Sequence, residues 1–243
     1  MQIRRPTLAR LFYRPSRSER LPATLIVCAW EPEVASLRRW LTTSDGRRRA
    51  RAVHVVAAGV GAVDAAIGTA QLIAAVRPRR VLFVGTAGVY PGARGRLPAI
   101  DDAVVVSRAM LVSTAALRDD GYLPAPVSTE VASHQTLVAQ LSLSPSPPIG
   151  AACPLAITKS AALARRIVRA TAAAVENLEL FAVARAATLA GLPFAAVVGI
   201  ANRVGPHAHA EWKAHHRSAS AAACAVVTTW IADHQTATAS AGG

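Results

Sequence analysis

The segment from Val175 to Trp212 constrains the fold more than any other part of the chain, because extended and helical patterns alternate within it. A short strand end precedes a helix predicted over Leu178–Ala190, and a Gly-Leu-Pro sequence breaks that helix. The continuous apolar run Phe194–Ile200 has the length of a buried strand, and a polar loop leads to a last helix, predicted over His209–His234. Strands that alternate with helices in this way form a sheet covered by helices. The pattern therefore predicts an α/β protein.

Two polar residues stand next to the predicted strands of this segment. Glu179 follows the first strand end at the start of the helix, and Asn202 ends the second strand. Ligands of α/β proteins bind at the carboxyl ends of the strands. A carboxylate and a carboxamide at two such ends suit a polar ligand that needs one charged partner and one partner that both donates and accepts hydrogen bonds. The structural alternative is that both residues only cap an amphipathic helix and a buried strand.

The chain is long enough for one large α/β domain, and its 52% hydrophobic residues allow a sizeable core. No repeat or linker divides it. We predict one domain over residues 23–234, a flexible basic extension over 1–22, and a disordered tail over 235–243. No run of about 18 apolar residues is present, so no membrane span is expected.

The formal charge of +13 raises the question of nucleic-acid binding. Arginines are concentrated in the first 20 residues and at Arg47, Arg48 and Arg49, without aromatic residues between them that would stack on bases. An arginine-rich, alanine-rich composition is common in GC-rich genomes, and we therefore do not expect a nucleic-acid partner. The acid-poor N-terminus is similar to a transit peptide, or reflects a start codon placed too early.

Neither the cysteines nor the histidines have the spacing of a metal site. The three cysteines lie far apart in apolar segments, which indicates buried thiols in a reducing cytoplasm. The pairs His207/His209 and His215/His216 lack acid or cysteine partners at ligand spacing, and surface or helix-end positions are expected for them. The sequence therefore predicts no metal and no cofactor.

The remaining elements are predicted from apolar runs and capping residues. The predicted strands are Ala23–Ala29, Ala52–Ala58, Arg80–Gly88, Asp101–Val106 and Ala151–Thr158. The predicted helices are one from Trp30 to about Leu41, one after the Gly59-Val60-Gly61 turn, one over Glu130–Leu141 and one from Ser160 to about Ala170.

Several of these motifs resemble one known family. Glu176-Asn177-Leu178-Glu179 followed by a helix, and a strand that ends in Ile-Ala-Asn202, resemble the carboxyl-terminal half of the nucleoside phosphorylase/nucleosidase superfamily, which includes purine and uridine phosphorylases. The Val-Gly-Pro sequence after the strand and Trp212 beyond it look most like the futalosine hydrolases of that superfamily. Upstream, Gly85-Thr86-Ala87-Gly88 is similar to its Gly-Ser/Thr-Ala-Gly motif. The resemblance implies a three-layer αβα sandwich with a central mixed sheet.

The resemblance also implies a site. Its catalytic residues would be Glu33, which orients the attacking water, Glu179, which binds the ribose hydroxyls, and Asn202, which contacts the purine. Glu33 has a structural alternative, since acidic residues in the first turn of a helix suit its dipole. The residues implied for substrate binding are Thr86, Ala87, Gly88, Asn177 and Leu178.

The implied activity is hydrolysis of a purine nucleoside. The Gly-Asp-Pro phosphate loop usual in phosphorylases is absent from this end of the chain, which favours water as the acceptor. The expected reaction converts futalosine to hypoxanthine and dehypoxanthine futalosine in menaquinone biosynthesis, since Asn202 suits a 6-oxopurine. A methylthioadenosine/S-adenosylhomocysteine nucleosidase or another nucleoside phosphorylase is the alternative within the family. The resemblance also implies a cytoplasmic homo-oligomer, most often a dimer.

Two positions depart from the pattern of the family. Val198 stands where related nucleosidases usually have Arg, and Ala201 stands where they have Ser. Both changes remove groups that would position water. A nucleoside-binding pseudoenzyme therefore remains open as an alternative of a different class, and the basic N-terminus leaves a nucleic-acid-associated protein open as well.

Overall fold

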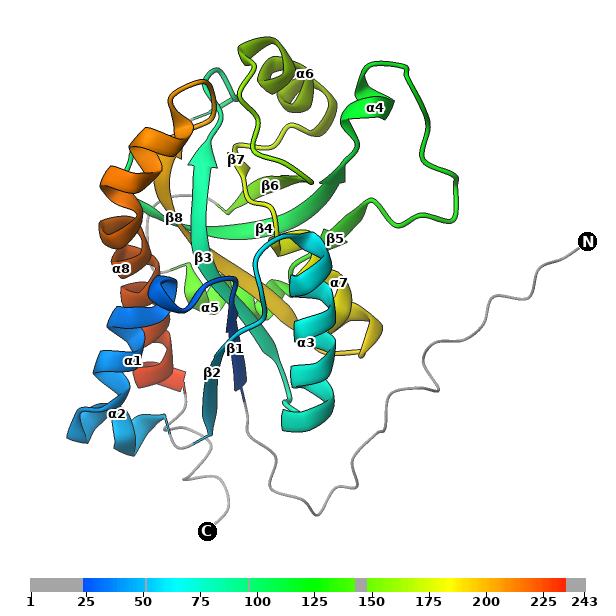
Figure 1. Ribbon diagram of the computed structural model, residues 1–243. Helices are drawn as coiled ribbons and strands as arrows, with labels where there is room; N and C mark the ends of the chain where they lie inside the picture. Colours follow the sequence, from blue (N-terminus) through cyan, green and yellow to red (C-terminus); the bar gives the residue numbers. More distant parts are fainter. Residues whose placement is uncertain (1–23, 51, 96, 143–147, 235–243) are drawn as a thin grey trace, which may run out of the picture.

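Eight strands form one mixed sheet at the centre of the molecule (Figure 1). The structure is a computed structural model that describes residues 24–50, 52–95, 97–142 and 148–234; the predicted extension 1–22 and tail 235–243 lie outside these ranges. The strands are β1 (Thr24–Cys28), β2 (Val53–Ala57), β3 (Val81–Val89), β4 (Ala103–Val112), β5 (Glu130–Ala132), β6 (Ile149–Pro154), β7 (Val175–Glu176) and β8 (Phe194–Arg203).

The last strand closes part of this sheet into a ring. The strands follow the order β2-β1-β3-β7-β6-β4-β5, and β8 pairs with β3 on one side and β4 on the other. Strands β3, β8, β4, β6 and β7 therefore surround a common interior. Strand β3 is parallel to both β1 and β8. The carboxyl ends of these three strands therefore meet at one edge of the sheet.

Helices cover both faces of the sheet, as the predicted αβα layers require. The helical elements are the 3-10 turn η2 (Glu31–Val34), α1 (Ala35–Leu41), α2 (Ser44–Arg49), α3 (Ala62–Val76), α4 (Thr114–Leu117), α5 (Gln135–Leu141), α6 (Ala161–Thr171), α7 (Leu180–Leu189) and α8 (Ala208–His234). Helices α3 and α7 pack side by side on one face, and α1 and α8 lie together on the other (Figure 1). None of the helices within the described ranges has both the length and the apolar character needed to cross a membrane.

Alternating side chains of β8 supply both faces of the core. Val198 and Ile200 belong to the cluster that α7 covers, whereas Val197 belongs to the cluster under α8. Because both faces are covered, the strand reads as one continuous apolar run in the sequence. The prediction of a buried strand at this position is confirmed.

Strand β4 continues to Val112 instead of ending at the predicted Val106, and two further predicted elements differ in the structure. Residues Glu130–Ala132 form β5 rather than the start of a helix, because they pair antiparallel with β4 and bury only Val131; the helix begins at Gln135. Strand β6 ends at Pro154 instead of continuing to Thr158. The Thr158 backbone N–H is outside the sheet and donates to the Glu176 carboxylate.

The basic triplet predicted as a patch is helix α2, and its guanidinium groups bind within the protein. Arg48 and Arg49 both donate to Asp45 Oδ1 at 2.8 Å, and Arg49 also reaches the carbonyl oxygen of Ala232 on α8. Arg47 donates to the carbonyl oxygen of Thr42. Arg47 and Arg49 therefore connect α2 to the end of α1 and to α8, whereas Arg48 bonds within α2.

Candidate functional site

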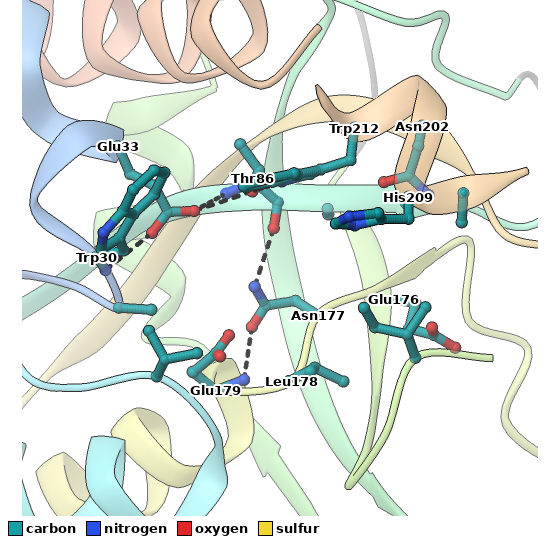
Figure 2. A pocket seen from close by; sticks show the side chains of 16 residues that line it. Trp30, Glu33, Thr86, Glu176, Asn177, Leu178, Glu179, Asn202, His209 and Trp212 are labelled. Atoms are coloured by element: carbon teal, nitrogen blue, oxygen red, sulfur yellow. Dashed lines mark hydrogen bonds between the residues drawn. The ribbon is translucent and has the colours of Figure 1, made fainter. Parts of the chain in front are cut away.

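A cavity of about 370 Å³ opens at the edge where β1, β3 and β8 end (Figure 2). The turn between β7 and α7 and the first residues of α8 complete its walls. Its volume is in the range of small-molecule sites. The cavity brings together all eight residues of the predicted site, which are Glu33, Thr86, Ala87, Gly88, Asn177, Leu178, Glu179 and Asn202.

Glu33 is held in this cavity by the backbone and side chain of Thr86. Its Oε1 accepts the N–H and the hydroxyl of Thr86, both at 2.9 Å, while Oε2 accepts the backbone N–H of Trp30 at 3.3 Å. Only 6% of the residue is exposed. Burial raises the pKa of Glu33 to about 7, and the negative charge of Glu179 adds to this, although the Thr86 donors oppose it. Glu33 can therefore exchange a proton near neutral pH.

Glu179 lies at the start of α7 and is bound by the glycine turn that precedes α3. The backbone N–H of Gly61 donates to its Oε1 at 2.8 Å. Gly61 has φ +86°, which side chains other than glycine rarely adopt. The Gly59-Val60-Gly61 turn therefore holds this carboxylate. Burial raises the pKa of Glu179, against the effect of the Gly61 N–H.

Asn177 connects β3 to the first turn of α7. Its Nδ2 donates to the carbonyl oxygen of Thr86 at 2.9 Å, and its Oδ1 accepts the backbone N–H groups of Glu179 and Leu180 at 3.0 and 2.7 Å. These bonds use most of the hydrogen-bonding capacity of a carboxamide. The predicted contact of Asn177 with substrate is not tested by this geometry, which instead shows it fixing Glu179.

Asn202 lies at the opposite end of the cavity from Glu33 (Figure 2). Its Nδ2 donates to the carbonyl oxygen of Arg203 at 3.0 Å. No protein group within the described ranges is hydrogen-bonded to its Oδ1. A Cβ at Gly88 would lie only 2.6 Å from Nδ2, so a side chain at this position would displace the Asn202 carboxamide. Asn202 therefore offers the cavity an acceptor and its second N–H.

Glu176 is a third buried carboxylate of the cavity, and sequence reasoning gave it no role. Its Oε2 accepts the hydroxyl of Tyr90 at 2.5 Å, and its Oε1 accepts the backbone N–H of Thr158 at 2.9 Å. Burial and the adjacent Glu176 raise the pKa of Tyr90. The only signal in the sequence was its place in the Glu-Asn-Leu-Glu motif.

Aromatic rings on α8 form the remaining wall. Trp212 donates its indole N–H to Thr86 Oγ1 at 3.1 Å. His209 lies against the Trp212 ring with 6.1 Å between centroids and 10° between planes, and it also lines the cavity. His209 is at a helix end, as expected, but its contact with the cavity was missed because the helical pattern does not show which way its first turn faces. The described residues contain no group of side chains able to hold a metal ion.

An ion pair fixes this wall to β8. Glu211 accepts the backbone N–H of Arg203 at 2.7 Å and its guanidinium at 2.7 Å. The pair joins the residue after Asn202 to the residue before Trp212. It therefore links the two ends of the cavity through the loop between β8 and α8.

Comparison with known proteins identifies the family. The sequence model of the family described as 'Phosphorylase superfamily' matches residues 25–232, which is most of the chain. The chain belongs to the phosphorylase superfamily. No curated protein gives a significant match by sequence.

Several solved structures share the fold. A futalosine hydrolase of Helicobacter pylori superposes with a TM-score of 0.74 at 16% identity, covering 86% of this chain and 97% of that one. A 5′-methylthioadenosine/S-adenosylhomocysteine nucleosidase of Helicobacter pylori gives 0.75 at 17% identity, covering 88% and 99%. A nucleosidase of the same description from Colwellia psychrerythraea gives 0.71 at 22% identity, covering 87% and 95%.

In this superfamily member the two departures predicted from the sequence are part of the core. Val198 and Ala201 are both fully buried, and Val198 pairs with Gly85 on β3 and Val104 on β4. Of the sixteen described residues that line the cavity, none is Lys or Arg. The charges that face a ligand are therefore mainly carboxylates.

Proposed function

We propose that the chain is a purine nucleosidase that hydrolyses the N-glycosidic bond. The observation that carries the proposal is one cavity with two buried carboxylates, Glu33 and Glu179, and the carboxamide of Asn202 across from them. Cleavage of a glycosidic bond gives the sugar the character of a cation in the transition state. Carboxylates in a water-poor site stabilise such a charge more strongly than water does.

In the proposed reaction a water oxygen bonds to C1′ as the C1′–N9 bond breaks, and the bonding electron pair leaves with the purine. Glu33 accepts a proton from the water, and solvent supplies the proton that the departing base takes up. Asn202 has no acidic proton to give; its Oδ1 accepts from protonated N7. Glu179 accepts from the ribose hydroxyls, and Leu178 packs against the sugar. Ala87 and Gly88 line the wall beside them.

Water is the proposed acceptor, rather than phosphate. Phosphate sites in proteins use arginine, lysine or converging backbone N–H groups. The described lining of the cavity has no Lys or Arg, and the Gly61 N–H is occupied by Glu179. A phosphate dianion would also lie beside carboxylates. These features support hydrolysis over phosphorolysis.

The proposed substrate is a 6-oxopurine nucleoside, and futalosine is the leading candidate, with hypoxanthine and dehypoxanthine futalosine as products in menaquinone biosynthesis. The open Oδ1 of Asn202 supports a base protonated at N7, and its remaining N–H suits an oxygen at C6. Methylthioadenosine and adenosylhomocysteine are the second candidate, because a nucleosidase for these compounds has an equally similar fold.

A base-release assay tests the function. Purified protein is incubated with futalosine, inosine, methylthioadenosine and adenosylhomocysteine, with and without phosphate, and free base is quantified. Free hypoxanthine from futalosine, independent of phosphate and lost in Glu33→Gln, is the expected result. Release of adenine alone favours the second candidate. Tight nucleoside binding without release of any base identifies the pseudoenzyme that Val198 and Ala201 suggest.

A cytoplasmic homodimer completes the proposal. The three free cysteines are buried, which agrees with a reducing compartment. Val63 and Ile67 are 69% and 54% exposed on α3, beside the cavity wall at Val60, and offer an apolar surface to a second copy. Light scattering of the purified protein gives the mass: twice that of the chain is expected, and a monomer at micromolar concentration contradicts the assembly.

A further inference from the structure

Trp212 is connected to Glu33 through one hydroxyl group. Thr86 Oγ1 lies 3.1 Å from the indole nitrogen of Trp212 and 2.9 Å from Glu33 Oε1 (Figure 2). An indole N–H can only donate, and a hydroxyl has a single proton. Because Trp212 occupies one lone pair of Oγ1, the hydroxyl proton of Thr86 is directed at Glu33.

The two carboxylate oxygens of Glu33 have different hydrogen-bond partners. Oε1 receives two donors from Thr86, the hydroxyl and the backbone N–H, each at 2.9 Å. A proton on Oε1 would face both donors and displace at least one of them. Oε2 has only the longer bond of 3.3 Å from the Trp30 backbone. Oε2 is therefore the oxygen able to take up a proton while the Thr86 bonds remain.

We propose that Trp212 is a positioning residue that acts through Thr86: it keeps Oε1 of Glu33 hydrogen-bonded and leaves Oε2 to receive the proton of the attacking water. The identity of that water rests on the proposed nucleosidase function. The hydrogen-bond chain and its effect on the protonation of Glu33 are independent of any turnover.

The position of the indole is well defined, which the role requires. The His216 ring stacks on Trp212 with 4.6 Å between centroids, and the Trp30 ring lies at 6.0 Å. Glu211, the preceding residue, is bound to Arg203 at the end of β8. Contacts on the ring and on its own helical turn therefore fix the direction of the N–H.

Other ionisable groups surround η2. They are Glu179 across the cavity, Glu31 with its partner Arg38, Cys28 on β1, His54 on β2, and Cys224, His209 and His216 on α8. The thiol pKa values of Cys28 and Cys224 are raised by burial, so neither thiol ionises near pH 7. Because several ionisable groups lie near Glu33, a signal specific for the Glu33 carboxyl is needed.

Carbon-13 NMR of protein labelled at the glutamate side-chain carboxyl gives that signal, and Glu33→Gln identifies it. The pKa of Glu33 is measured in the full chain as wild type, Trp212→Phe, Thr86→Val, Thr86→Ser and the double variant Trp212→Phe/Thr86→Val. Trp30→Phe is the matched control, because it removes an indole from the same stack, and the Trp30 backbone N–H remains.

We expect Trp212→Phe to raise the pKa of Glu33 by about half a unit to one unit. A weakened hydrogen bond to the carboxylate costs about 1 kcal/mol, and one pKa unit corresponds to about 1.4 kcal/mol. Thr86→Val raises it at least as far, and adding Trp212→Phe to Thr86→Val changes nothing more. Thr86→Ser and Trp30→Phe leave the pKa near that of the wild type. If the protein is active, the acidic limb of its pH–rate profile moves by the same amount.

An unchanged pKa in Trp212→Phe overturns the proposal, and so does an equal shift in the Thr86→Val background. An inactive protein with the expected titrations contradicts only the nucleosidase function. An active enzyme in which neither Trp212→Phe nor Thr86→Val changes the pKa of Glu33 contradicts only the role of Trp212.

Discussion

The two ends of the cavity differ in how much of their polar surface the protein itself occupies. At the Glu33 end, Glu33, Thr86, Asn177 and Glu179 are bound to one another or to backbone groups. At the Asn202 end, Oδ1 has no partner within the described ranges. The first end holds its shape without a ligand, as electrostatic stabilisation of a transition state requires. The second is completed only by a ligand, and so it can discriminate among ligands.

Removing the charge of Glu33 is expected to have the largest effect. Glu33→Gln keeps the shape of the side chain but has no base for water, so kcat should fall roughly a thousandfold, within the range for loss of a general base. Wild-type activity should rise with pH through about 7, as Glu33 loses its proton. Steady-state rates from pH 5 to 9 check both statements, and a variant retaining a tenth of the activity would exclude Glu33 as the base.

The free energy of unfolding of the same variant distinguishes the loss of the base from unfolding of the protein. The folded-state pKa of Glu33 is raised from 4.5 to about 7, so the folded state binds the proton more tightly than the unfolded state. This contribution is fully present below pH 4.5 and is lost as pH rises through 7. Glu33→Gln has no carboxylate that becomes charged as pH rises. Its free energy of unfolding at pH 8 should therefore exceed that of the wild type, by up to about 3 kcal/mol.

The second carboxylate of this end should matter somewhat less. Glu179→Gln retains the size of the residue but weakens its bonds to the ribose hydroxyls as positive charge develops on the sugar. We expect kcat/KM to fall about a hundredfold, equivalent to about 3 kcal/mol of transition-state stabilisation. Near-normal turnover by a folded Glu179→Gln protein, judged by circular dichroism, would remove this residue from the site.

At the Asn202 end we expect a change of preference instead of a loss of rate. The wild type should prefer 6-oxopurine to 6-aminopurine nucleosides by roughly tenfold to a hundredfold, because an amino group would face the Asn202 N–H donor to donor. Asn202→Asp supplies an acceptor and should move the ratio of kcat/KM values towards the aminopurine. An unchanged ratio means that Asn202 does not contact the base.

The smallest effect concerns the space beside Asn202. In Gly88→Ala the added Cβ meets Asn202 Nδ2 at 2.6 Å and displaces the carboxamide. The substrate KM should rise about tenfold, since one hydrogen bond of about 1.4 kcal/mol is lost, while kcat changes less. Gly121→Ala is the matched control, because its nearest neighbour lies 3.8 Å away. Equal KM values for the two variants would separate Gly88 from binding.

The sequence predicted most strands, the layers of the fold and the location of the candidate residues. These depend on local patterns: apolar runs, breaks at glycine and proline, and polar residues at strand ends. Strand β5 was missed because Glu130–Ala132 has no strand pattern of its own, and its pairing with β4 depends on a tertiary contact. The pairing of β8 with both β3 and β4 could not be predicted either, because the sequence shows only a buried apolar run there.

The missed parts of the site have the same cause. Trp212 and His209 were assigned to a helix, but the side of that helix that meets the cavity is set by the loop after β8 and the Arg203–Glu211 pair. The resemblance of the Glu-Asn-Leu-Glu motif implied Asn177 as a substrate-binding residue, and that contact stays a prediction; its bonds to Thr86, Glu179 and Leu180 depend on the distance between β3 and α7. The motif alone therefore does not show that one of its side chains also holds the backbone of its neighbours.

The place of β8 between β3 and β4 has a consequence for the synthesis of the chain. Until residues 194–203 leave the ribosome, β3 and β4 each lack a neighbouring strand, and such open edges pair readily with other chains. Asn202 emerges with this strand and Trp212 emerges after it, so the cavity around Glu33 and Glu179 is complete only then. A nascent chain is therefore most prone to aggregate just before β8 appears, and it acquires the cavity only after Trp212 has been made.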